Sequence, residues 1–190
     1  MMRLITFLCL LLATASSHAA ESLIAGVFDP PRDAPELSIP GTHGKELKLA
    51  DYRGKVVIVG FGFTSCPDVC PTTLAVLAQA RKKLGELADQ LQVVYITVDP
   101  QTDTAERMRK YLATFDPTFV GGTGTAEQLE AVRKQYGIIA NKKEYGSSYT
   151  YAHSSYTYLI DRAGKLRALM PYGHKPDDYV HDVRLLLSER

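Results

Sequence analysis

The chain is poor in cysteine, has no excess of charge of either sign, and contains one apolar run of about ten residues, its longest. Its formal net charge is +1 at pH 7, from 22 Lys and Arg against 21 Asp and Glu. A balanced charge gives no electrostatic reason to expect a nucleic-acid or anionic-membrane partner. Three cysteines cannot make a disulfide-rich scaffold, and a chain of 190 residues can bury a core without one. Internal repeats, charge blocks and low-complexity tracts are also missing, so composition favours one globular domain.

The apolar run lies at the N-terminus and resembles a secretory signal. Arg3 supplies the positive start, residues 4–13 are mostly apolar, and Ser-His-Ala at 17–19 places small residues at the cleavage position. A run of about ten residues is too short to span a bilayer, which takes about twenty. We expect cleavage after Ala19 and a soluble periplasmic protein, with an uncleaved membrane anchor as the alternative. The remaining chain is expected as an extended arm at 20–38 and one domain at 39–190.

Alternating strand and helix patterns indicate an α/β fold of the thioredoxin-like type, a central mixed sheet flanked by helices, with an N-terminal β-hairpin extension. The first expected elements are a small hairpin at 39–49 and two buried strands at 56–61 and 93–98, with a helix between the strands that carries Leu77, Ala80, Leu84, Leu87 and Leu91. A helix capped by Thr102 or Asp103, a short strand at 118–120 and a helix between Thr125 and Gly137 follow. The chain is expected to end with a hairpin at 156–161 and 166–170 and a last helix that begins at Pro176.

Topology can bring two cysteines and one histidine to the same edge of this sheet. Sites in such sheets form at the carboxyl ends of the parallel strands, and Cys66 follows the strand at 56–61. If the hairpin that begins near Tyr156 runs antiparallel to that strand, the residues just before it reach the same edge. His153 would then lie close to Cys66 and Cys70. This prediction depends on the orientation of the hairpin.

Cys66 and Cys70 are the only cysteines outside the N-terminal segment, which contains Cys9. Because Pro71 disfavours helical geometry at Cys70, we expect a tight turn from Cys66 to Cys70 and a regular helix from Pro71. Either way, both thiols lie near a helix N-terminus, where the helix dipole lowers a thiol pKa. The pair could form a structural disulfide or a redox-active one. Its three-residue spacing departs from the C-x-x-C of common dithiol oxidoreductases.

Two thiolates and an imidazole are ligands that favour copper, and Cu(I) in particular. A structural zinc ion would usually take a fourth protein ligand. His43, His174 and His181 are available, but surface positions are expected for them, with His174 a weaker candidate for a place beside the ligands.

Two aspartates are expected near this edge. Asp68 lies between the cysteines and Asp99 ends the strand at 93–98. Capping of the adjacent turn or loop is the favoured interpretation of each. A supporting role beside the metal ligands is the alternative, and Asp99 could also help to dock a partner.

The sequence resembles the SCO/SenC family of copper-binding, thioredoxin-like proteins. The matching motifs are Gly-Phe-Thr-Ser-Cys-Pro-Asp-Val-Cys-Pro at 62–71, Thr-Val-Asp-Pro at 97–100 followed by Asp-Thr at 103–104, and His-Ser-Ser at 153–155 ahead of Thr-Tyr-Leu-Ile-Asp at 157–161. The resemblance runs from about residue 27 to residue 187. It implies that Cys66, Cys70 and His153 bind one copper ion, with Cu(I) expected and Cu(II) left open.

The same resemblance implies a role in metallating the dinuclear copper site of cytochrome c oxidase, or in keeping the cysteines of that site reduced. The expected partners are the copper-accepting oxidase subunit and, less directly, another periplasmic copper chaperone or a thiol–disulfide reductase. A metallochaperone is therefore favoured over an enzyme, with a thiol–disulfide reductase and a copper or redox sensor as alternatives. The chain departs from the family pattern at Ala152, where members commonly have an aspartate.

Overall fold

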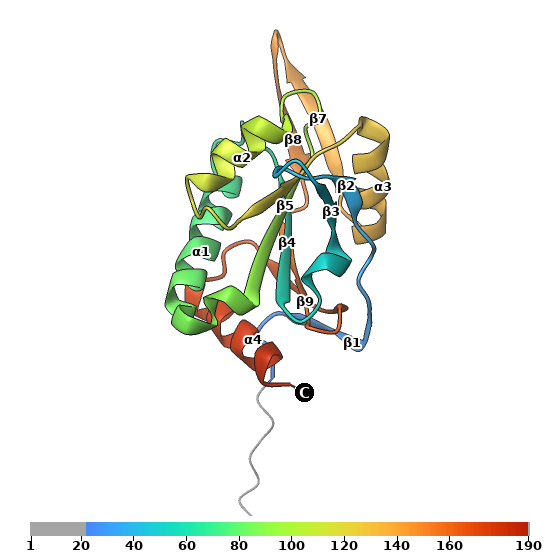
Figure 1. Ribbon diagram of the computed structural model, residues 1–190. Helices are drawn as coiled ribbons and strands as arrows, with labels where there is room; N and C mark the ends of the chain where they lie inside the picture. The colour runs from blue at the N-terminus through green and yellow to red at the C-terminus, as the bar shows by residue number, and fades with distance from the viewer. Residues whose placement is uncertain (1–21, 190) are drawn as a thin grey trace, which may run out of the picture.

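The computed structural model describes residues 22–189, so the expected signal segment and its cleavage site lie outside the described residues. A six-stranded sheet in the order β1-β10-β9-β4-β5-β6 forms the centre of the molecule (Figure 1). Its strands are β1 (Gly26–Asp33), β4 (Val56–Gly62), β5 (Leu91–Thr97), β6 (Val120–Gly122), β9 (Tyr156–Ile160) and β10 (Lys165–Pro171). The helices are α1 (Val69–Leu84), α2 (Ala105–Ala113), α3 (Ala126–Tyr136) and α4 (Pro176–Ser188).

The middle of the sheet is built from two strands that are buried along their whole length. Every residue of β4 and β5 is buried, as the continuous apolar runs predicted. The two strands pair in parallel from Val56↔Leu91 to Gly62↔Thr97. Figure 1 shows α1, α2 and α4 on one side of the sheet and α3 on the other. The expected thioredoxin-like arrangement is confirmed.

The hairpin β9–β10 completes the sheet on the other side of β4. Strand β9 runs antiparallel to β4, with Gly60 opposite Thr157, and β10 runs antiparallel to β9. The orientation on which the site prediction depends is therefore confirmed. The chain enters β9 at the same edge of the sheet where β4 ends and the loop with Cys66 begins.

The first helix differs from the prediction at both ends. It begins at Val69, because Pro71 falls in the first turn, where its missing N–H would have no helical partner. It ends at Leu84, and the next residue, Gly85, has a positive φ of 60°. Leu87 lies in a 3-10 turn over Gly85–Gln90, and Leu91 opens β5, so assigning these two leucines to the helix was wrong.

Two other boundaries shift by one or two residues. The side chain of Thr104, rather than that of Thr102 or Asp103, caps α2 by accepting from the Arg107 N–H. The short strand expected at 118–120 is β6, two residues later.

The helix with a capping box at Thr125 and a left-handed Gly137 is confirmed as α3. The last helix is confirmed as α4 with Pro176 in its first turn.

Two smaller sheets accompany the central one. Strands β2 (Ser38–Pro40) and β3 (Glu46–Lys48) form the expected N-terminal hairpin. Strands β7 (Ala140–Tyr145) and β8 (Ser148–His153) form a second hairpin, which is not among the expected elements. Residues 26–33, expected within an extended arm, are extended but pair with β10 as the edge strand β1. Within residues 22–189, no helix has the length and apolar character to cross a membrane.

Candidate metal centre

The two cysteines lie where the buried strand β4 passes into helix α1. Cys66 is half-buried in the connecting loop, and Cys70 is 1% exposed in the first turn of α1. The Cys70 N–H donates to Cys66 Sγ over 3.4 Å, so one of the free amides in the first turn of the helix faces the dithiol. Both residues are free thiols in this structure.

Burial dominates the electrostatics of Cys70. Desolvation and a hydrogen bond with Cys66 raise the pKa of the Cys70 thiol to about 12, although Tyr95 and the Phe63 backbone oppose the shift. The expectation that the helix dipole would lower this pKa was wrong, because Cys70 is packed into the core and a thiolate there loses its hydration. Cys70 is therefore a neutral thiol at pH 7, and a metal ion must displace its proton to bind.

A buried tyrosine hydroxyl reaches this thiol from the neighbouring strand. Tyr95 on β5 is 2% exposed, and its side chain is hydrogen-bonded to Cys70. The close approach depends on Gly62 at the end of β4. A Cβ at that position would collide with the Tyr95 hydroxyl and lie 2.7 Å from Cys70 Sγ.

His153, the last residue of β8, approaches the dithiol as predicted. Its Nε2 lies 3.6 Å from Cys70 Sγ, and its Nδ1 lies 2.9 Å from the Ser154 carbonyl oxygen. Because a carbonyl only accepts, Nδ1 carries the proton and donates to Ser154, which leaves the Nε2 lone pair facing the sulfur. Burial lowers the pKa of His153, so the ring is neutral at pH 7.

The donor atoms suit a soft metal ion but do not yet surround one. Cys70 contacts both Cys66 and His153, which brings the three predicted residues to one place. In the part of the chain that the structure describes, no three His, Cys, Asp or Glu side chains are arranged to hold a metal ion as they stand. Two thiols and an imidazole with a free Nε2 fit a soft ion of low coordination number. Binding would require these side chains to converge.

The start of the cysteine loop is held by a buried carboxylate that the sequence did not single out for this role. Asp103 has no exposed surface and accepts hydrogen bonds from the Thr64 N–H at 3.0 Å, the Thr64 hydroxyl, and the Thr97 hydroxyl at 2.6 Å. Arg107 Nε lies 3.7 Å from the same carboxylate and supplies the opposite charge. Its guanidinium also donates to the hydroxyls of Thr64 and Ser65. Asp103 therefore ties the loop of Cys66 to the end of β5.

The two aspartates considered from the sequence do not act as caps. Asp68 occupies the N-cap position of α1, but its exposed side chain makes no capping hydrogen bond. Asp99 is 1% exposed, and its carboxylate accepts from the Tyr149 hydroxyl on β8, at 3.0 and 3.2 Å. The favoured capping interpretation was wrong for both residues. A supporting role for either beside the metal ligands stays a prediction.

The other histidines have partners of their own. His43 is exposed beside Thr42, His174 Nδ1 lies 3.0 Å from Asp178, and His181 Nδ1 lies 2.9 Å from Asp182.

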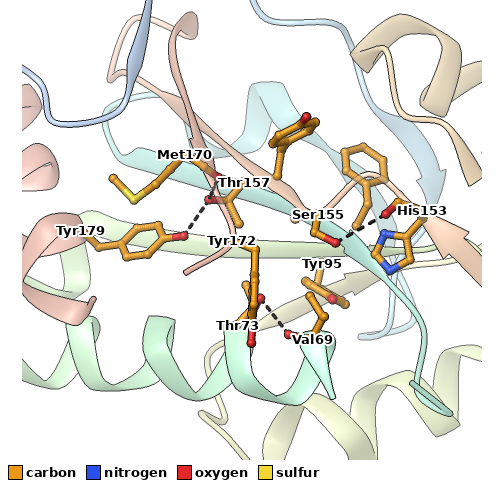
Figure 2. Close-up of a pocket in the computed structure, with 12 residues that line it drawn as sticks. Val69, Thr73, Tyr95, His153, Ser155, Thr157, Met170, Tyr172 and Tyr179 are labelled. Atoms are coloured by element: carbon orange, nitrogen blue, oxygen red, sulfur yellow. Dashed lines mark hydrogen bonds between the residues drawn. The ribbon is translucent and has the colours of Figure 1, made fainter. Parts of the chain in front are cut away.

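A small crevice opens beside His153 (Figure 2), with Tyr95 at the same end and Thr157, Met170 and Tyr179 at the other. Its volume of about 10 Å³ is enough for one water molecule and too small for an organic substrate.

The fold and the site define a thioredoxin-like protein that carries a dithiol at the start of a helix and a histidine facing it. The family model described as SCO1/SenC matches residues 27–188. The chain therefore belongs to the SCO1/SenC family.

Its relatives include known proteins and solved structures. It is 31% identical to the SCO2-like protein of Rickettsia prowazekii, over 86% of each chain. It is 35% identical to a SCO2-like protein of Rickettsia felis, over 65% of this chain and 62% of that protein. The structure of Bradyrhizobium japonicum ScoI with copper bound is 30% identical and has a TM-score of 0.74, with 80% of this chain and 98% of that chain covered.

Proposed function

We propose that this protein is a periplasmic copper metallochaperone that holds one copper ion through Cys66, Cys70 and His153. The observation that carries the proposal is the approach of the neutral His153 Nε2 to Cys70 Sγ, at 3.6 Å, beside a second free thiol. The copper-bound relative supports the choice of metal. Soft thiol donors favour Cu(I), and the ion is cargo that enters when the thiols lose their protons.

The acceptor proposed is the dinuclear copper site of cytochrome c oxidase, as membership of the SCO1/SenC family implies. Transfer by ligand exchange needs a site that another protein can reach. Cys66 meets this need because it is half-buried in a loop, whereas Cys70 is buried. Oxidation of Cys66 and Cys70 to a disulfide would remove both thiolate ligands, so redox state would gate loading.

The same asymmetry supports a second candidate function. A half-buried thiol beside a buried one is an arrangement in which Cys66 attacks a partner disulfide and Cys70 resolves the mixed disulfide. In that case the protein would reduce a disulfide between the oxidase cysteines to two thiols while Cys66 and Cys70 become a disulfide, and this exchange would not require His153.

Copper titration of the reduced chain without residues 1–19, against a competing Cu(I) chelator, tests the proposal. We expect one tight copper per chain, weakened at least a hundredfold by Cys66→Ser or His153→Ala because each removes a metal ligand. His43→Ala is the matched control, because it removes an exposed imidazole elsewhere. Weak binding that does not depend on His153, with continued reduction of a disulfide substrate, would leave the reductase instead.

A further inference from the structure

The hairpin that ends in His153 stands apart from the central sheet. Among the described residues, β7 and β8 pair only with each other, and five of the six residues of β7 are exposed. Figure 1 shows the hairpin projecting beyond the rest of the molecule. A lone two-stranded hairpin is marginally stable in water at best. Contacts with the rest of the molecule must therefore fix the position of His153.

Three side chains on one face of β8 make these contacts. Because side chains alternate along a strand, Tyr149, Tyr151 and His153 share a face. The Tyr151 ring centroid lies 5.7 Å from that of Phe63, next to the cysteine loop, and the His153 ring centroid lies 6.1 Å from the same phenyl ring. Tyr149 lies 6.0 Å from Tyr151 and extends this row of rings away from the dithiol.

Tyr149 supplies the polar end of this row. Its hydroxyl donates to the carboxylate of Asp99, at 3.0 and 3.2 Å, and also contacts the Thr102 hydroxyl. Asp99 is 1% exposed and lies two residues after the end of the buried strand β5. A buried carboxylate that loses a hydrogen-bond donor is left poorly solvated, which makes this contact costly to break. The hydrogen bond therefore joins the hairpin to the frame that carries the cysteines.

We propose that Tyr149 and Asp99 are positioning residues whose hydrogen bond holds β8 against the body of the protein and keeps His153 beside Cys70. The inference rests on the proposed function, because it gives His153 a ligand's role. Neither residue touches the ion; both act through the placement of the imidazole four residues after Tyr149.

Tyr149→Phe tests this inference because it removes the hydroxyl and keeps the ring. We expect about a tenfold loss of Cu(I) affinity and about tenfold faster hydrogen exchange of the β7–β8 amides in the metal-free protein, as loss of a hydrogen bond to a charged group implies. Tyr145→Phe is the matched control, because Tyr145 lies on the same hairpin and is 62% exposed. It should change neither measurement. Asp99→Asn should act in the same direction, and Tyr149→Phe still tests the inference if that variant does not fold.

The variant is then combined with His153→Ala to separate positioning from general destabilisation. If Tyr149 acts through the imidazole, Tyr149→Phe should not weaken copper binding further in the His153→Ala background. A tenfold loss that persists there, or exchange and affinity like those of wild type in Tyr149→Phe, would overturn the inference. Wild-type binding that does not depend on His153 would instead defeat the proposed function, while the exchange rates would still show whether the hydrogen bond holds the hairpin.

Discussion

The two sides of the candidate metal centre are built on different kinds of structure. The cysteines follow β4, in which every residue is buried and which pairs with a strand on each side. His153 ends the hairpin β7–β8, which is mostly exposed and, within residues 22–189, pairs with no strand of the central sheet. The dithiol therefore follows a fully buried strand, whereas the imidazole is carried by a hairpin with few buried residues.

This difference suits the proposed function, in which the protein gives up a bound copper ion. Segments with few buried contacts open at a lower free energy than the core does. In that function, the thiols would keep a constant position while the histidine withdraws and an acceptor ligand replaces it. A copper site built entirely on the central sheet would hold the ion equally well but would offer no ligand that can leave easily.

The largest expected effect comes from truncating a buried side chain in the central sheet, on the cysteine side of the site. Leu159 on β9 has no exposed surface, so Leu159→Ala should lower the free energy of unfolding by about 2–5 kcal/mol through lost burial and a cavity. Lys143→Ala on the exposed strand β7 should change it by less than about 0.5 kcal/mol. Urea unfolding followed by circular dichroism measures both. Equal losses in the two variants would show that the hairpin contributes to the core as much as β9 does.

A smaller effect is expected at the end of β4, where Gly62 lies against Cys70. Gly62→Ala places a methyl group against the Tyr95 hydroxyl and Cys70 Sγ, which should cost about 1–3 kcal/mol of stability by overpacking and weaken copper binding by moving Cys70. Gly26→Ala is the matched control, because its nearest atom would lie 3.6 Å away.

Adding Tyr95→Phe to Gly62→Ala removes the clashing hydroxyl and should restore part of the lost stability. If Gly62→Ala is as stable as Gly26→Ala, the packing around Cys70 is looser than the structure indicates.

The free energy of unfolding should also depend on pH, through Cys70 at alkaline pH and through His153 at acidic pH. The folded protein raises the pKa of Cys70 from 9.0 to about 12, so the unfolded chain loses this proton first and the free energy of unfolding should fall between those pH values. Burial lowers the pKa of His153 below 6.5, so the unfolded chain gains its proton first and stability should fall as the pH drops below 6.5. Urea unfolding of the reduced, metal-free protein across pH measures both. Cys70→Ala should remove the alkaline contribution and His153→Ala the acidic one.

Much of the central sheet and its helices could be predicted from the sequence, because their sequence signals are local. The apolar runs of β4 and β5 and the capping box of α3 lie within short windows. The continued leucine spacing after Leu84 misled the helix assignment, because positive φ at Gly85 ends α1 while the spacing runs on by chance.

The histidine side was predictable only in part. The meeting of His153 with the dithiol followed from strand order and direction alone. The hairpin was missed because the middle of β7 is polar, and the alternation of Tyr149 and Tyr151 on β8 is too short to reveal a half-buried face. The roles of Asp103 and Asp99 depend on partners 39 and 50 residues away, Thr64 and Tyr149, and no local pattern reports such contacts.

The smallest expected effect concerns one cation on the hairpin β7–β8. Lys142 Nζ lies 4.1 Å from the centroid of the Tyr149 ring and 3.2 Å from the side-chain oxygen of Gln101, so it adds a second contact between the hairpin and the loop after β5. A cation over an aromatic ring at an exposed site contributes about 0.5–1 kcal/mol. Lys142→Ala should therefore speed hydrogen exchange of the β7–β8 amides severalfold and leave the exchange of β4 and β9 unchanged, because the core opens only on global unfolding. Lys143→Ala, the neighbouring exposed lysine, should leave both sets of amides unchanged. Faster exchange in β4 as well would mean that hairpin and sheet open as one unit, and the histidine could not then withdraw while the thiols stay in place.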